Sequence, residues 1–165
     1  MCIRDRLKVE PSKIEAIEKI AEPKNVKELQ SFLGLASYYR RFVPNFSKIA
    51  EPSYCLTKKG VVFSFDEMPQ KALKSLKEHL MSAPVLAYPK FSEPFIITTD
   101  ASKSGIGAVL SQILDKEEKP INFASRSLNA AEKNYSTIER ECLAIVLALH
   151  YFRPYIYGYK IYKKT

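Results

Sequence analysis

The strongest constraint on the fold is a change of hydrophobic periodicity near Pro84. Before this residue, apolar side chains recur at helical spacing in three segments, 14–20, 26–36 and 73–80. After it, the runs 95–100 and 106–112 have the composition of β-strands, and a turn that ends in Gly105 joins them. A helical pattern returns after Ser136. The sequence therefore predicts an α/β (mixed α+β) chain, with a helical first part followed by a mixed sheet that carries one long helix.

The first two helices have clear start and stop residues. The first ends before Pro23, because proline cannot continue a helix. The second begins at Asn25, whose side chain can cap the first turn together with Glu28, and it runs to Pro44. Gly34 lies in the middle of this helix, where glycine costs about 1 kcal/mol relative to alanine. We therefore expect Gly34 to permit close packing.

The remaining elements follow from similar signals. A third helix is predicted to begin at Asp66 as its cap, and 61–65 before it is either a short strand or an extended connector. After the hairpin, 120–124 reads as a third strand. Ser136 and Glu139 form a capping box that opens the long helix. A further strand begins shortly before the C-terminus.

Asp100 is the main candidate for chemistry, because it ends an apolar strand directly before the turn. Burying a carboxylate there is costly unless it binds a partner. Glu141 lies inside the later apolar helix. A strand carboxylate and a helix carboxylate that face each other can hold divalent metal for phosphodiester chemistry. A turn-capping role for Asp100 is the alternative, and the pattern alone leaves both open.

Two acids of the long helix compete for the second position. The expected packing stripe of this helix consists of Ile138, Cys142, Ile145, Leu149 and Phe152, with Cys142 as a buried free thiol. Glu141 adjoins the stripe and precedes Ala144 and Ala148, whose small side chains let the helix lie close to the sheet and bring the carboxylate toward Asp100. Glu139 is explained by the capping box. A solvated surface position is the alternative for Glu141.

Charge and cysteine content indicate the kind of binding partner and the cellular compartment. The net charge of +8 and the pI of about 9.3 suit a polyanionic partner such as nucleic acid. The cysteines at positions 2, 55 and 142 are scattered, so a zinc site is not expected, and free thiols fit a reducing compartment. The sequence has neither a long apolar run nor a secretory signal pattern. We expect an intracellular protein, cytoplasmic or nuclear, without a membrane partner.

Further candidate nucleic-acid contacts combine cations with small or aromatic residues. They are Ser102, Ser104, Arg40, Arg41 and Arg126. The small turn residues, including Gly105 and Gly107, could admit a nucleic-acid backbone, and hairpin geometry alone is the alternative. Tyr38 and Tyr39 beside the two adjacent arginines could line a nucleic-acid groove, whereas packing is the more common role of such tyrosines. The alternative for Arg126 is a plain exposed side chain.

Three segments carry a resemblance to a known family. TDASKSGIGAVLSQ (99–112) and INFASRSLNAAEKNYSTIERECLAIVLAL (121–149) resemble the ribonuclease H domain of gypsy-type (LTR) retrotransposon Pol polyproteins. The segment 26–42 resembles the piece that joins the reverse transcriptase thumb to that domain. The resemblance implies a helical thumb/connection segment over 7–83 and an incomplete ribonuclease H-like domain over 84–165. Residues 1–6 read as a non-native leader, with a disordered N-terminus as the alternative.

The resemblance also implies an activity and its residues. The parent polyprotein would perform RNA-directed DNA synthesis and metal-dependent hydrolysis of RNA in RNA–DNA hybrids, with the hybrid and the remainder of the polyprotein as partners. The family pattern Tyr-Ser-x-x-Glu-x-Glu-x-Leu-Ala makes Glu141 a catalytic acid, with Asp100, and both would bind two Mg²⁺ ions in the complete domain.

The family uses four acids, and the third would follow directly after Thr165. We therefore interpret the chain as a fragment cut at both ends, with weak or absent Mg²⁺ binding and no cleavage on its own. The alternative is a non-catalytic nucleic-acid-binding or structural relic of a transposable element.

Overall fold

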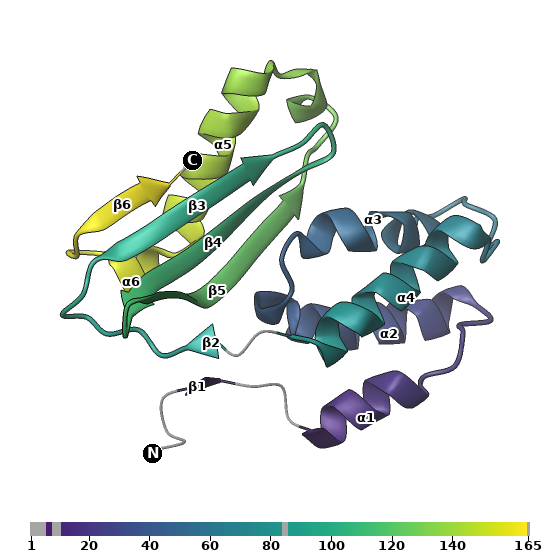
Figure 1. The fold of residues 1–165 in the computed structure, drawn as a ribbon. Coiled ribbons are helices and arrows are strands. Elements are labelled where there is room, and N and C mark those ends of the chain that lie inside the picture. Colours follow the sequence, from purple (N-terminus) through teal and green to yellow (C-terminus); the bar gives the residue numbers. More distant parts are fainter. Residues whose placement is uncertain (1–5, 8–10, 84–85, 165) are drawn as a thin grey trace.

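The computed structural model describes residues 6–7, 11–83 and 86–164 of the chain. The elements in chain order are β1 Arg6–Leu7, α1 Pro11–Lys19, α2 Val26–Tyr38, the 3₁₀ turn η2 Arg40–Phe42, α3 Phe46–Leu56, α4 Glu67–Met81, β2 Leu86–Ala87, β3 Phe95–Ala101, β4 Gly105–Leu114, β5 Glu117–Ser127, the 3₁₀ turn η3 Glu132–Asn134, α5 Thr137–Tyr151, α6 Arg153–Ile156 and β6 Ile161–Lys164. Helices α1–α4 form one part, and a sheet with α5 and α6 forms the other (Figure 1). The change of periodicity predicted at Pro84 falls between these parts, at residues outside the described range.

Helices α2 and α4 begin at the residues that the sequence predicts. The side chain of Asn25 accepts a hydrogen bond of 2.9 Å from the backbone N–H of Glu28 and so caps α2. Asp66 takes the cap position of α4, but its carboxylate accepts a hydrogen bond of 2.7 Å from the Ser64 hydroxyl and makes no cap bond to the helix. Residues 61–65 form an extended connector without strand pairing.

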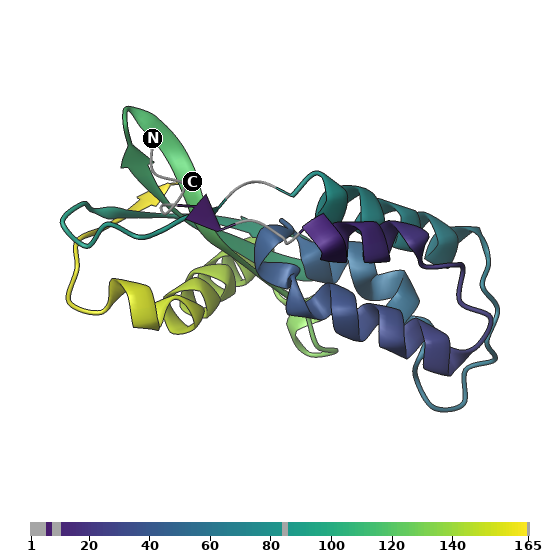
Figure 2. The ribbon, with the colours of Figure 1, turned by 90° about the horizontal axis from the view of Figure 1, so that it is seen from below.

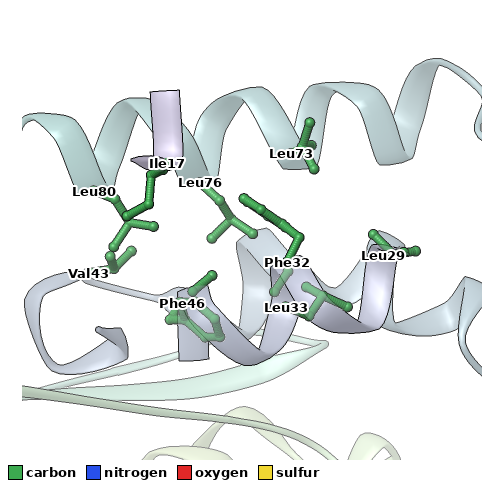
Figure 3. Packing of buried hydrophobic residues seen from close by; sticks show 11 residues of the cluster. Ile17, Leu29, Phe32, Leu33, Val43, Phe46, Leu73, Leu76 and Leu80 are labelled. Atoms are coloured by element: carbon green, nitrogen blue, oxygen red, sulfur yellow. The ribbon is translucent and has the colours of Figure 1, made fainter. Parts of the chain in front are cut away.

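The four helices enclose their own hydrophobic core. Its buried members are Ile17, Leu29, Phe32, Leu33, Ala36, Val43, Phe46, Ala50, Leu73, Leu76 and Leu80. Figure 3 shows Leu76 of α4 turned toward Phe32 of α2, with Phe46 of α3 close beneath. Full burial of each large side chain contributes about 1.5–3 kcal/mol, so this cluster fixes the arrangement of the helices.

Two predictions for the helical part are wrong. The element that was to run to Pro44 ends at Tyr38, and a separate helix, α3, follows Asn45 and contains Pro52. Tertiary packing of α3 against α4 and β5 outweighs the cost of a proline within a helix. Gly34 is exposed, and a β-carbon built there would meet nothing within 4 Å, so it does not serve close packing.

The second part is a four-stranded mixed sheet, as predicted. The strand order is β5-β4-β3-β6, with antiparallel β3–β4 and β4–β5 pairs and a parallel β3–β6 pair. Asp115 and Lys116 connect β4 to β5 with positive φ values of 55° and 67°, typical of a two-residue hairpin turn. Across the sheet, Asp100 lies opposite Gly107, and Gly107 lies opposite Ser125.

Helix α5 packs on β3 and β4 through its small residues. A full capping box between Ser136 and Glu139 opens it, as predicted. Ala144 and Ala148 are buried against the sheet, and Phe152 belongs to the same core as Ala148. In Figure 2, α5 and α6 run along one face of the sheet. Helix α5 ends at Tyr151, and the short helix α6 that follows contains Pro154.

The packing stripe predicted for α5 is wrong apart from Phe152. Ile138 is 73% exposed and Leu149 is 43% exposed, and Cys142 is exposed rather than buried. The helix is apolar on two faces, and the sheet takes the alanine face because it allows the closer approach. Cys55 is also exposed, while Cys2 lies outside the described residues.

The helical part covers the opposite face of the sheet. Side chains alternate between faces along a strand. Ala108 and Ala124 belong to the core shared with α5, whereas Phe123 and the partly buried Val109 pack with Phe42 of η2. Strands β4 and β5 therefore lie between α5 on one face and the helical part on the other. None of the helices formed by the described residues combines the length and apolar composition needed to cross a bilayer.

Candidate active site

Asp100 lies near the C-terminal end of β3 and is exposed. It takes no part in the turn that follows. The hydroxyl of Ser102 holds that turn instead, accepting hydrogen bonds from the N–H groups of Gly105 at 3.0 Å and Ser104 at 3.3 Å. Within the described residues, the Asp100 carboxylate has no hydrogen-bond or ion-pair partner. The turn-capping alternative for Asp100 is therefore wrong, and its carboxylate is available to bind something else.

Glu141 is exposed on the first half of α5, one turn before Ala144. Ala144 packs with Ile106 and with the partly buried Ala101, which directly follows Asp100. The backbone positions of both acids therefore lie at the same end of the sheet. Because strand residues alternate, Asp100 points to the face away from α5. Glu141 starts from the helix on the other face, so a ligand shared by the two carboxylates would have to lie around the strand end rather than across the helix–sheet contact.

Glu139, the competing acid of α5, is used by the capping box. Its carboxylate accepts a hydrogen bond of 2.7 Å from the Ser136 N–H, and its own N–H donates to the Ser136 hydroxyl at 3.3 Å. The backbone N–H of Ser136, and after it the Ser136 hydroxyl, hold the pKa of Glu139 below its ordinary value. The structural explanation of Glu139 is confirmed.

The oxygen donors of Asp100 and Glu141 are of the type that Mg²⁺ prefers. The described residues contain no group of three or more His, Cys, Asp or Glu side chains that could hold a metal ion. Two carboxylates would leave most of an octahedral shell to water and substrate. The residues present thus fit Mg²⁺ in chemical type and supply only part of a site.

Gly105 and Gly107, which both belong to β4, have a packing explanation that the sequence did not specify. A β-carbon at Gly105 would come within 3.2 Å of the backbone oxygen of Arg126. At Gly107 it would clash with the side-chain oxygen of Asn45, which belongs to the helical part. At Gly107, the space is therefore filled by the protein itself.

The candidate arginines differ in how they are held. Arg126 makes a two-pronged ion pair with Glu132, with N–O distances of 2.8 and 3.0 Å. This pair raises the pKa of Arg126 and, with the Asn129 N–H, lowers that of Glu132. Arg40 donates from Nη2 to the backbone carbonyl of Ser125, and Arg41 is exposed. Within the described residues, Arg40 has no carboxylate partner.

The seam between the two parts contains polar residues that sequence reasoning missed. Ser47 donates its N–H to the hydroxyl of Ser125 at 3.0 Å, and the two hydroxyls bond to each other at 3.0 Å. Asn45 has a left-handed φ of 51°. The Pro44-Asn45 dipeptide was the one available signal, since such pairs favour turns. Of the two tyrosines, Tyr39 packs against Phe42 and Tyr38 is 75% exposed.

Comparison with known protein families identifies the second part and the helix before it. The model for the "RNase H-like domain found in reverse transcriptase" matches residues 65–162, which is more than half of the chain. The match begins ahead of α4, so it includes that helix.

Curated relatives are retrotransposon polyproteins. The chain is 43% identical over 165 residues to the retrovirus-related Pol polyprotein from transposon opus and 44% identical over 167 residues to that from transposon gypsy, both of Drosophila melanogaster. These alignments cover 93% and 94% of the chain but 16% of each relative. The transposon Tf2-3 polyprotein of Schizosaccharomyces pombe is 38% identical, over 86% of the chain and 11% of that protein. The chain thus spans about one sixth or less of the length of these relatives.

Solved structures with a similar arrangement include foamy viral enzymes. The foamy viral protease-reverse transcriptase dRH in complex with double-stranded DNA matches with a TM-score of 0.82 and 26% identity, over 94% of the chain and 28% of that protein. The foamy viral protease-reverse transcriptase in complex with an RNA/DNA hybrid matches with a TM-score of 0.79 and 27% identity, over 94% and 21%. Both matches span the helical part as well as the sheet.

Proposed function

Because the chain belongs to the RNase H-like domain family found in reverse transcriptases, within retrotransposon Pol polyproteins, we propose that it serves RNA-strand hydrolysis in RNA–DNA hybrids. In this proposal the parent polyprotein also performs RNA-directed DNA synthesis. The polymer partner is the hybrid, and the remainder of the polyprotein is the protein partner. An intracellular location, cytoplasmic or nuclear, follows from this function and stays a prediction.

The observation that carries the proposal is the state of Asp100. An exposed carboxylate at a strand end has no internal partner within the described residues, while a neighbouring hydroxyl, that of Ser102, performs the turn-capping task. Glu141 lies one helical turn before Ala144, and Ala144 packs beside Ala101, the neighbour of Asp100. Two free carboxylates near one end of a sheet support a shared metal-binding role.

Asp100 and Glu141 would each supply carboxylate oxygens to Mg²⁺. Bound there, such ions would supply activation of an attacking water and stabilisation of the leaving oxygen. Asp100 would contribute from the end of β3, and Glu141 would contribute from α5. We propose that residues outside this chain supply the other acids of the site. Residues 1–165 alone would then bind Mg²⁺ weakly and cleave hybrid negligibly.

We also propose a division near residue 84, with 7–83 as the thumb/connection segment and 84–165 as the ribonuclease H-like domain. The core packing of Leu73, Leu76 and Leu80 with α1–α3 supports assigning α4 to the helical part. The family match starts at residue 65 and would instead include α4 in the domain. The leader proposed for residues 1–6 falls on residues that, apart from Arg6, lie outside the described range.

A second candidate function is nucleic-acid binding without cleavage. It is favoured by the net charge of +8 together with the absence, among the described residues, of a three-ligand metal group. Charge of this size gives attraction to phosphates that weakens as salt rises. The two functions differ in their dependence on Asp100 and on divalent metal.

The deciding experiment measures cleavage of a labelled RNA–DNA hybrid by a longer protein that continues into the downstream polyprotein. Mg²⁺-dependent cleavage is expected, and Asp100→Asn or Glu141→Gln should abolish it. Glu139→Gln is the matched control, because glutamine preserves the capping box and should preserve activity. Cleavage that survives Asp100→Asn would disprove the site assignment. Strong chelator-sensitive cleavage by residues 1–165 alone would disprove the expectation that further acids are required.

A further inference from the structure

An open pocket of about 200 Å³ lies at the seam between the helical part and β5. Its polar lining comes from both parts: Arg40, Ser47, Tyr54, Ser125, Arg126 and Ser127. A water molecule occupies about 30 Å³ in the liquid, so the pocket can hold a small ionic group with several waters.

The excess charge of the pocket comes from Arg40. Arg126 is neutralised by its two-pronged pair with Glu132. Arg40 has no carboxylate partner within the described residues, but its guanidinium contacts neighbouring protein groups. Its guanidinium donates to the Ser125 carbonyl and lies 6.0 Å from the centroid of the Phe46 ring. An uncompensated guanidinium beside hydroxyl groups is a typical anion-binding arrangement.

Some hydroxyl groups of the pocket bond to each other within the protein, and others are open to a ligand. Those of Ser47 and Ser125 bond to each other and are buried. Tyr54 and Ser127 are exposed, and within the described residues their hydroxyls have no protein partner. The pocket therefore presents one cation and two free hydroxyl donors to solvent.

The pocket lies close to Asp100 on the same face of the sheet. Asp100, Gly107 and Ser125 stand directly opposite one another on three adjacent strands. Neighbouring strands are about 4.8 Å apart, so Ser125 is roughly 10 Å from Asp100 across the sheet. A nucleic-acid strand that presents a phosphate at Asp100 can reach the pocket with a nearby phosphate.

We propose that this pocket binds one backbone phosphate of the nucleic acid, with Arg40 as the cation and Tyr54 and Ser127 as hydroxyl donors. The inference rests on the proposed nucleic-acid substrate, but it requires no metal ion and no cleavage. It gives Arg40 two roles: it joins the two parts through Ser125, and it contacts the substrate.

The test is fluorescence anisotropy of a labelled RNA–DNA hybrid with the full chain, in chelator, between 50 and 200 mM salt, where phosphate contacts dominate. Arg40→Gln should weaken binding roughly tenfold, as expected for one lost charge-assisted hydrogen bond. The slope of log K against log salt should fall by about 0.9, the contribution of one phosphate contact. Arg153→Gln, which removes an exposed arginine of α6, is the matched control and should have a smaller effect.

A second variant keeps the test informative if Arg40→Gln does not fold. Ser127→Glu adds a negative charge at the exposed mouth of the pocket and should also weaken binding. Ser92→Glu is its control, because it makes the same change in the exposed loop that precedes β3. If folded Arg40→Gln and Ser127→Glu both bind like their controls, the pocket is not a phosphate site. Because chelator is present, this result is independent of whether Asp100 and Glu141 bind metal.

Discussion

The side chain of Asn45 lies over Gly107, so closely that a β-carbon at Gly107 would clash with its Oδ1 atom. Asn45 precedes α3 in the helical part, but its side chain does not cap that helix. Gly107 is the cross-strand neighbour of Asp100. A residue of the helical part thus rests on the strand position beside the candidate metal-binding acid, which couples the two parts at the site.

This contact predicts a specific coupling between the two residues. Gly107→Ala should destabilise the chain by about 1–3 kcal/mol, because the added methyl group displaces the Asn45 side chain. Asn45→Gly tolerates the left-handed φ of 51° and removes the obstructing atom. In that background Gly107→Ala should cost at least about 0.5 kcal/mol less. Urea unfolding of the four proteins measures the coupling, and strictly additive effects would contradict it.

Substitution of Gly34 by alanine should raise stability, in contrast to the same substitution at Gly107. It is exposed in the middle of α2, and an added β-carbon meets nothing within 4 Å. Gly34→Ala should therefore stabilise the chain by about 0.5–1 kcal/mol through helix propensity alone. The same urea experiment provides the measurement. A loss of stability would mean that Gly34 has a packing role after all.

Substitutions at the capping box and at Asp100 should affect the unfolding free energy differently. Ser136→Ala removes the cap of α5 and should cost about 1 kcal/mol of unfolding free energy. Asp100→Asn should change it by less than about 0.5 kcal/mol, because the carboxylate has no partner within the described residues. Thermal unfolding compares the two variants. A large loss from Asp100→Asn would indicate a structural role and weaken its assignment as a metal ligand.

Acid sensitivity should depend on Glu132. Its pKa is lowered, first by the hydrogen bonds from Arg126 and then by the Asn129 N–H. A lowered folded-state pKa gives stability that is fully present above the ordinary glutamate value of about 4.3 and is lost as pH falls through the folded value. Glu132→Gln should therefore flatten the fall in urea midpoint between pH 5 and about pH 3. Glu22→Gln is the matched control, and equal slopes for wild type and Glu132→Gln would refute the prediction.

Local signals in the sequence were sufficient for much of the fold. The hairpin after Asp100, the cap at Asn25 and the box at Ser136 each depend on a few adjacent residues, and all are confirmed. Helix α3 was missed because Pro44 and Pro52 oppose a helix locally, while its stabilising contacts come from α4 and β5. Long-range packing of this kind leaves no local pattern.

The candidate site shows the same division. The sequence pattern predicts Asp100 at a strand end and Glu141 within a helix, and the structure has Asp100 in β3 and Glu141 in α5. The seam of Asn45, Ser47 and Ser125 was not predictable, because its members are 78 or more residues apart across the two parts. Glycine at position 107 indicates that another group approaches the backbone closely, but the sequence does not show that this group is the Asn45 side chain.

Helix α5 provides the sharpest disagreement with periodicity, and hence the last prediction. Ile138, Cys142 and Leu149 form a regular apolar stripe, yet Ile138 is 73% exposed and the sheet contacts the alanine face. Periodicity cannot choose between two apolar faces, whereas close approach of helix and sheet favours alanine.

Ala148 is fully buried, so Ala148→Leu should overpack the helix–sheet contact and cost about 1–3 kcal/mol. Leu149→Ala removes a larger side chain from a partly exposed position and should cost less than about 1 kcal/mol, well under the 2–5 kcal/mol typical of a buried leucine. Urea unfolding of both variants measures the difference. If Leu149→Ala proves the more damaging, the stripe of Ile138, Cys142 and Leu149 is the packed face and the helix is rotated relative to the arrangement described above.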